Sequence, residues 1–258
     1  MENLAVMIYF TVLSSVLGAA FGSFMNCMAW RMVHGESVFR GRSHCTSCGH
    51  TLGAVDLVPI VSYLACKGAC RYCGEKISPR YLLAEVLPAL GFAGFFLSYG
   101  FSVLTLRAMV LLCILLGASM VDISIYEIPD GFVLAGILWW AVTLPFLGGS
   151  VMENLKEGLC GGLLIGGVVL LTALCMDWLL KKETMGGGDI KLLFMVGLYV
   201  GVWQGLLLLF LSCLLGLALS FGTRQNRIPF GPAIGAAACL VLIIGEPVTR
   251  WYFSLIAF

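Results

Sequence analysis

The sequence predicts an all-α, polytopic membrane protein of about eight transmembrane helices, with a small cytoplasmic zinc-binding insert between the first two. Three observations lead to this fold class. Of the 258 residues, 60% are hydrophobic and 11% are charged, whereas soluble domains carry about 25% charged residues. Much of the chain divides into apolar runs near the ~20 residues that cross a bilayer. One polar segment, 31–80, interrupts them and holds five of the eleven cysteines.

The first apolar run, residues 4–30, is predicted as a membrane-spanning helix. It lacks the basic n-region and the cleavage site of a signal peptide. Seven further runs follow the polar segment, and each is expected to be helical because a spanning backbone must satisfy its own hydrogen bonds. They cover about residues 81–99, 102–121, 130–147, 158–181, 189–200, 202–222 and 230–256. The predicted parts are therefore a first helix (1–30), the insert (31–80) and a seven-helix membrane core (81–258).

Glycines mark two features of the predicted core. Gly158, Gly162 and Gly166 recur every four residues, which is the small-residue spacing that lets two membrane helices approach closely. Gly201 separates the sixth run from the seventh. The boundary between these two spans therefore depends on this glycine.

Basic residues set the predicted orientation, because lysine and arginine concentrate on the cytoplasmic side of membrane proteins. With eight spans, twelve of the fifteen fall on the side of the insert. These are Arg31, Arg40, Arg42, Lys67, Arg71, Lys76, Arg80, Lys181, Lys182, Lys191, Arg224 and Arg227. The insert is therefore expected to face the cytoplasm. The formal net charge of +1 gives no reason to expect a nucleic-acid partner.

The insert contains two matching cysteine motifs, CTSCGH from residue 45 and CRYCGE from residue 70. Each C-x-x-C-G turn lets two thiolates reach one ion, and the glycine permits a backbone turn with positive φ. Together Cys45, Cys48, Cys70 and Cys73 supply the four sulfurs preferred by structural zinc. Redox pairs or disulfides are the alternative, and a cytoplasmic location disfavours disulfides. Three other donors are predicted to be bystanders: Cys66, His44 and His50.

Two aspartates stand at equivalent ends of predicted spans. Asp122 lies at the inner end of the third span and Asp189 at the entrance of the sixth, so both are expected at the same membrane depth. A carboxyl group at such a position indicates function. Two carboxyl groups sharing a site do not both ionise easily, so that one acts as base and the other as acid. This is the logic of an aspartic protease.

The neighbouring residues allow structural readings as well. Gly186, Gly187 and Gly188 precede Asp189 and are candidates for admitting an extended substrate beside it, but a flexible linker followed by a helix cap is the alternative. Asp130 follows Pro129 at the predicted start of the fourth span. An acid in this position is expected simply to start a helix.

The arrangement resembles the type IV prepilin peptidases, which belong to the GxGD membrane aspartyl proteases. The similar residues are Asp122 with Pro129 and Asp130, and the GGGD sequence ending at Asp189. Three further segments also resemble this family: GSFMNCMAWR from residue 22, ISPRYLLAE from residue 77 and FGP from residue 230. One departure is Ile128, where the family commonly has leucine.

The resemblance implies a multi-pass enzyme of the bacterial inner membrane. It implies that Asp122 and Asp189 are catalytic and that the substrates are prepilins or pseudopilins, cut after a glycine at the cytoplasmic face. It also implies a second step, N-methylation of the new terminus with S-adenosylmethionine, associated with the cysteine-containing insert. No residue is assigned to this cofactor, because the sequence has no glycine-rich nucleotide loop.

Two other classes of function compete with a peptidase. A transporter would use the acids as a proton relay, but transporters often contain inverted repeats and none is evident in the sequence. A non-catalytic assembly protein would use the zinc insert to dock partners. That class predicts that asparagine is tolerated at both Asp122 and Asp189.

Overall fold

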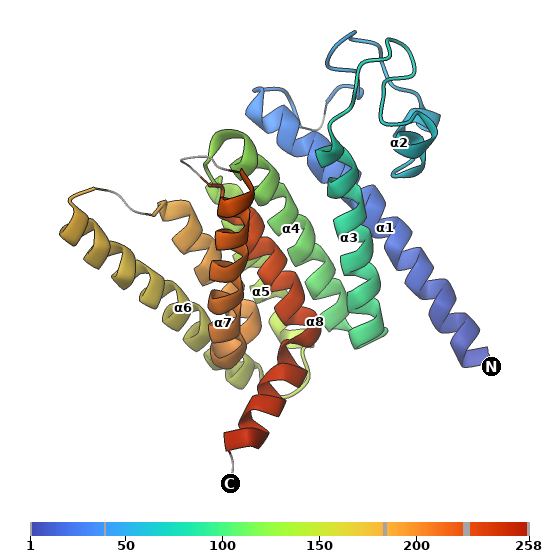
Figure 1. Cartoon of the computed structure of the whole chain (residues 1–258). Helices are drawn as coiled ribbons and strands as arrows, with labels where there is room; N and C mark the ends of the chain where they lie inside the picture. Colours follow the sequence, from blue (N-terminus) through green and yellow to red (C-terminus); the bar gives the residue numbers. More distant parts are fainter. Residues whose placement is uncertain (1, 39, 183–184, 224–227, 257–258) are drawn as a thin grey trace. The chain divides into compact units, whose positions relative to one another are not determined.

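The computed structural model describes residues 2–38, 40–182, 185–223 and 228–256, and these residues form helices without any extended sheet. Arg224 and Arg227, which entered the charge count, lie outside the described residues. The elements are α1 (Glu2–Val33), η1 (Ala54–Leu57), α2 (Val61–Ala65), α3 (Pro79–Tyr99), α4 (Val103–Ile125), α5 (Asp130–Thr143), η2 (Leu144–Phe146), α6 (Val151–Leu180), α7 (Gly187–Thr223) and α8 (Gly231–Ile256) (Figure 1). The predicted all-α fold class is confirmed.

Six of the described helices are long and apolar enough to cross a membrane, and a shorter apolar helix covers Asp130–Phe146. The observed boundaries follow the predicted runs closely except at α6. This helix begins at Val151, seven residues before the predicted start at 158. Its first two turns contain Glu153, Lys156 and Glu157, and a criterion based on apolar runs excludes such residues.

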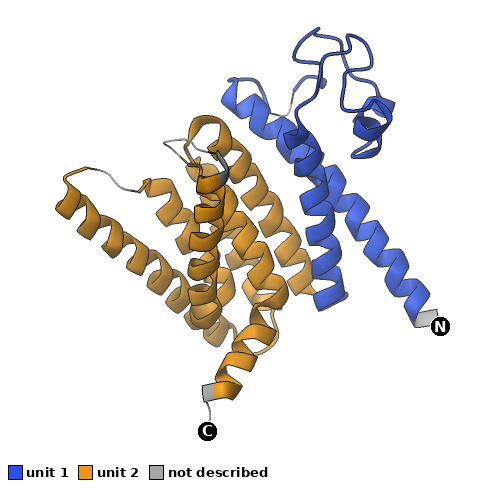
Figure 2. Ribbon diagram, viewed as in Figure 1, with its two compact units in different colours: residues 1–101 blue, residues 102–258 orange. Residues whose placement is uncertain are grey.

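The chain forms two compact units, residues 1–101 and 102–258, which Figure 2 colours separately. In the first unit α1 packs against α3. A Cβ on Gly18 would lie 2.3 Å from the carbonyl oxygen of Pro88, and one on Gly22 would lie 2.2 Å from that of Ala84. The backbones therefore touch along an antiparallel pair. Helix α3 belongs with α1 and the insert in this division, whereas the sequence grouped residues 81–258 together.

In the second unit α6 packs against α7 through the glycines predicted to allow close approach. A Cβ on Gly158 would lie 2.8 Å from the carbonyl oxygen of Leu198, and one on Gly166 would lie 2.8 Å from the Cβ of Phe194. Gly162, between them, also faces Leu198. The close-packing prediction for this spacing is confirmed.

Helix α7 is interrupted at Gly201, the predicted boundary between two spans. Gly201 has φ 70° and ψ −167°, a backbone conformation that only glycine adopts readily. Gly161 of α6 lies against Gly201, while Gly205 lies against Ile165, one turn further along α6. The chain therefore reverses direction at Gly201. Segments 187–200 and 202–223, with α5 and the five other long helices, make eight apolar helical segments in the described chain.

Replacing Gly201 with alanine is expected to destabilise the protein by about 1–3 kcal/mol, because alanine is strained in this conformation. Thermal unfolding of the purified protein in detergent measures the change. Gly167→Ala is the matched control, since Gly167 lies within α6 and a Cβ there would meet nothing within 4 Å. Equal unfolding temperatures for the two variants would contradict the strain at Gly201.

Candidate active site and metal centre

The insert brings the four predicted cysteines together. The Sγ atoms of Cys45, Cys48, Cys70 and Cys73 all lie within 4.8 Å of one another. The Sγ atoms of Cys45 and Cys73 are 4.0 Å apart. A tetrahedral zinc ion with Zn–S bonds of about 2.3 Å would separate its sulfurs by about 3.8 Å. The four sulfurs are thus spaced as a site that could hold a metal ion.

The two cysteine turns share one backbone geometry. In the first turn the N–H of Cys45 donates to the carbonyl of His50, and the N–H of Gly49 donates to the carbonyl of Cys45, both at 2.9 Å. The second turn repeats these bonds from Cys70 and Gly74, at 2.8 and 2.9 Å. The two glycines have φ of 71° and 74°. The prediction of a positive φ after each C-x-x-C is confirmed.

The thiol groups have different acidities in this cluster. Backbone N–H groups of Cys48 and Ser47 stabilise the thiolate of Cys45 and lower its pKa to about 6. At Cys73 the N–H of Glu75 acts in the same direction, but desolvation and the three neighbouring thiols outweigh it and raise the pKa to about 12. Four sulfurs this close cannot all be thiolates without a cation, and they suit a divalent ion with affinity for sulfur.

The three other donors in the insert lie outside the four-sulfur cluster. The ring centres of His50 and Tyr72 lie 3.6 Å apart, and those of His44 and Trp30 lie 5.7 Å apart in an edge-to-face arrangement. Cys66 does not join the group of four. That these three residues are bystanders stays a prediction.

Two residues hold the insert to its membrane helices, and the sequence analysis did not single out either as a structural anchor. Arg31, 7% exposed at the end of α1, donates to four backbone carbonyls of the following loop. These acceptors belong to Ser37, Val38, Arg40 and Gly41. Glu85 of α3 accepts a bond of 2.6 Å from the N–H of Ile60. Neither contact follows a helical or strand spacing, because Arg31 reaches carbonyls six to ten residues ahead and Glu85 reaches an N–H 25 residues back.

The second unit places Asp122 in the last turn of α4. Its side chain is 5% exposed, and its Oδ2 accepts a bond of 2.8 Å from the N–H of Gly231 at the start of α8. Asp189 stands in the first turn of α7. The segment before Asp189 contacts the loop that follows α4, at Gly188 and Ile128. The structure thus brings both aspartates to the same end of this unit.

The glycines before Asp189 differ in their surroundings. A Cβ on Gly188 would lie 3.0 Å from the Cβ of Ile128, in the loop between α4 and α5, whereas one on Gly187 would meet nothing within 4 Å. The N–H of Asp189 donates to the carbonyl of Gly186 at 3.1 Å. Gly188 is therefore a close contact between the segments that carry the two aspartates, and Gly187 leaves open space.

Asp130 is the first residue of α5 and follows Pro129, as predicted for an acid that starts a helix. Its Oδ1 also forms an ion pair of 2.7 Å with the Nζ of Lys191, and both side chains are exposed. This pair joins the starts of α5 and α7. An exposed pair of this kind contributes little stability.

The described chain is a multi-pass membrane protein with four clustered thiol groups in one unit and two aspartates in the other, Asp122 buried and Asp189 half-buried. Two family models match separate parts of the chain. The Bacterial Peptidase A24 N-terminal domain matches residues 16–99, and the Type IV leader peptidase family matches residues 109–221.

Curated relatives match over nearly the whole chain. A "Prepilin leader peptidase/N-methyltransferase" of Pseudomonas putida is 33% identical, covering 97% of this chain and 96% of the relative. A protein of the same name from Bacillus subtilis (strain 168) is 30% identical over 93% of this chain and 96% of its own. A "Type 4 prepilin-like proteins leader peptide-processing enzyme" of Escherichia coli O78:H11 is 32% identical over 90% and 93%. No solved structure matches the chain. The chain belongs to the type IV leader peptidase family.

Proposed function

We propose that this protein is an aspartic endopeptidase that removes the leader peptide of prepilins or pseudopilins after a glycine, using Asp122 and Asp189. The observation that carries the proposal is the meeting of two distant segments: Gly188, directly before Asp189, contacts Ile128 in the loop after α4, where Asp122 is buried and accepts a hydrogen bond from the Gly231 N–H. The names of the relatives support the substrate class.

The proposed chemistry uses the two carboxyl groups as a base and an acid. The ionised group takes a proton from water, and the resulting hydroxide attacks the carbonyl carbon of the scissile peptide. The protonated group donates a hydrogen bond to the carbonyl oxygen. When the tetrahedral intermediate collapses, the C–N bond breaks and the leaving amine takes up the proton that the first carboxylate had removed from water. Because Asp122 Oδ2 is bound to Gly231, its Oδ1 is the oxygen that serves the reaction.

The location proposed for the reaction is the cytoplasmic membrane face. The support is the concentration of lysine and arginine that the positive-inside rule places on the side of the insert. The apolar helix of a pilin precursor would place its scissile bond near the lipid head groups, where helix ends such as those carrying Asp122 and Asp189 are expected. The open space at Gly187 supports an approach of extended substrate beside Asp189.

A structural zinc ion held by Cys45, Cys48, Cys70 and Cys73 is part of the proposal. The support is the convergence of the four sulfurs and their donor chemistry. The names of the relatives support a second activity, N-methyl transfer from S-adenosylmethionine to the new terminus. When bound, this cofactor would supply the methyl group. The ion would chiefly stabilise the fold of the small insert.

The contact between Gly231 and Asp122 offers a specific test. A Cβ at Gly231 would lie 2.8 Å from Asp122 Oδ2, so Gly231→Ala is expected to displace that carboxyl group and lower kcat by about 10²-fold. Cleavage of a purified prepilin in liposomes, followed by its mobility shift, measures the rate. Gly131→Ala is the control, because a Cβ there would meet nothing within 4 Å. A normal rate for Gly231→Ala in a folded protein would contradict the role of this contact.

A further inference from the structure

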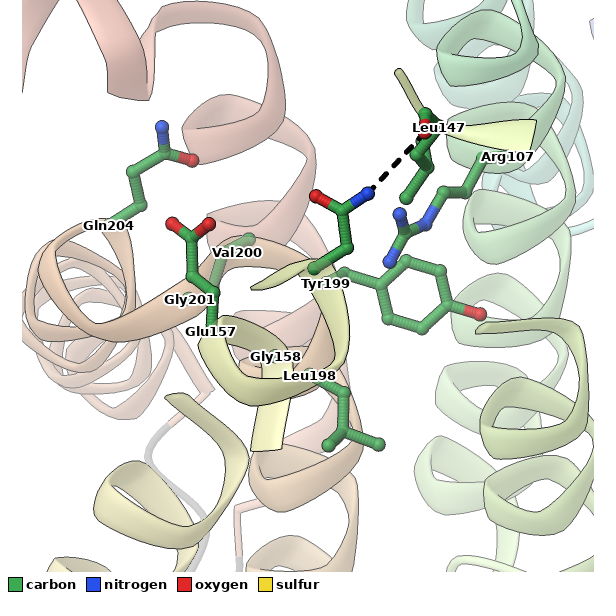
Figure 3. Close-up of a pocket in the computed structure, with 10 residues that line it drawn as sticks. Arg107, Leu147, Glu157, Gly158, Leu198, Tyr199, Val200, Gly201 and Gln204 are labelled. Atoms are coloured by element: carbon green, nitrogen blue, oxygen red, sulfur yellow. Dashed lines mark hydrogen bonds between the residues drawn. The ribbon is translucent and has the colours of Figure 1, made fainter. Parts of the chain in front are cut away.

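The second unit contains a polar cavity that the proposed peptidase does not use. Its volume is about 180 Å³, and α4, α6 and the turn of α7 contribute most of its lining. The polar side chains that line it are Arg107, Asn154, Glu157, Tyr199 and Gln204, and all of these except Asn154 are labelled in Figure 3.

The cavity lies at the opposite end of the unit from the aspartate pair. Arg107 stands in the second turn of α4 and Asp122 in the last, fifteen residues further on and thus roughly 22 Å along the helix axis. Glu157 stands in the second turn of α6. The cavity therefore lies near the opposite ends of these helices from the aspartates.

Arg107 is a buried cation without a matching anion. Arg107 is 7% exposed, and its Nε has no hydrogen-bond partner among the described residues. Its guanidinium lies 4.8 Å from the centre of the Tyr199 ring (Figure 3). No ion pair within 4.0 Å forms to Arg107 in the described part of the chain. A buried charge is costly unless an opposite charge pairs with it. Because Arg107 lines the cavity, an anion bound there could provide that charge.

Glu157 provides the opposite charge on the exposed side of the same cavity. It too has no ion-pair partner within 4.0 Å among the described residues. Two amide side chains accompany it in the lining, from Asn154 and Gln204. The Nδ2 of Asn154 donates to the carbonyl of Gly148 at 3.2 Å, which leaves its Oδ1 oriented as an acceptor. The cavity thus combines a buried positive group with an exposed acidic and amide-rich side.

We propose that this cavity binds a zwitterionic head group, with a phosphate at Arg107 and a primary ammonium at Glu157. A purely anionic ligand would meet the carboxylate, and a purely cationic one would meet the guanidinium. A quaternary ammonium lacks the N–H groups that Glu157 and the two amides can accept. Phosphoethanolamine therefore fits the chemistry, supplied either by a phospholipid of the surrounding leaflet or as a soluble molecule.

Thermal unfolding of the full-length protein in detergent tests the proposal. The lipid probes are the dioleoyl forms of phosphatidylethanolamine, phosphatidylcholine and phosphatidylglycerol. The soluble probe is glycerophosphoethanolamine. We expect the ethanolamine lipid to raise the unfolding temperature more than the other two lipids. Glu157→Gln is expected to weaken the apparent affinity for the ethanolamine lipid about tenfold, the effect of one lost charge-assisted bond, and so to remove this preference.

Glu153→Gln is the matched control, because Glu153 is an exposed acid one turn earlier on α6 and does not line the cavity. It should retain the preference. Stabilisation by glycerophosphoethanolamine equal to that by the lipid would support the proposal with a soluble source, and stabilisation by the lipid alone would support a lipid source. Equal effects of all three lipids on the wild type, or an unchanged preference in Glu157→Gln, would overturn it. Glu157→Gln leaves the buried Arg107 intact, so the test does not depend on a variant that fails to fold.

Discussion

Replacing either Asp122 or Asp189 with asparagine is expected to lower the rate of prepilin cleavage by about 10³-fold or more. An amide can neither take a proton from water nor return it to the leaving amine, and the remaining carboxyl group cannot act as base and acid at once. The measurement is the mobility shift of a prepilin incubated with each variant in liposomes. Asparagine keeps the shape of the side chain, so its Oδ1 can still accept the bond that Gly231 N–H makes to Asp122.

Asp130→Asn is the matched control for this experiment. Asp130 is a nearby acid in the same unit, but it is exposed and paired with Lys191, so its substitution should leave cleavage within a few-fold of the wild type. If a folded variant of Asp122 or Asp189 cleaves normally, that residue is not catalytic and serves only as a helix cap. The missing acid would then be sought at Asp130.

The second large effect is expected in the insert. Serine at Cys48 or Cys70 should reduce bound zinc from about one ion per chain to a small fraction, because structural zinc needs four ligands in a closed site. The ion would stabilise this small insert strongly, so its loss should unfold residues between α1 and α3. Elemental analysis of the purified protein measures the metal, and limited proteolysis measures the unfolding.

Cys66→Ser provides the comparison in the same segment. Cys66 lies in the insert but outside the group of four sulfurs, so this variant should keep its zinc and its resistance to protease. Full zinc content in both Cys48→Ser and Cys70→Ser would contradict the proposed ligand set.

Features that depend on neighbouring residues could be predicted from the sequence. The apolar runs predicted the membrane helices, and Gly201 predicted the break within α7. The glycine after each C-x-x-C predicted a turn with positive φ. Counting spans also predicts a common membrane depth for Asp122 and Asp189, and this depth stays a prediction. In each case the signal lies within a few residues, or depends only on how often the chain crosses the membrane.

Contacts between distant segments were outside the reach of such patterns. The FGP segment was noted for its resemblance, but nothing in it indicates that the Gly231 N–H binds Asp122 across 109 positions. The same is true of Lys191 with Asp130 and of Glu85 with the N–H of Ile60. These bonds depend on how helices pack, and one sequence carries no periodic signal for that.

The division of the chain at residues 101 and 102 has a consequence for how the gene can vary. All four clustered cysteines belong to the first unit, and both aspartates belong to the second. The connection between α3 and α4 is short, running from Gly100 to Ser102. A gene split there would leave each set of reactive side chains whole on its own polypeptide.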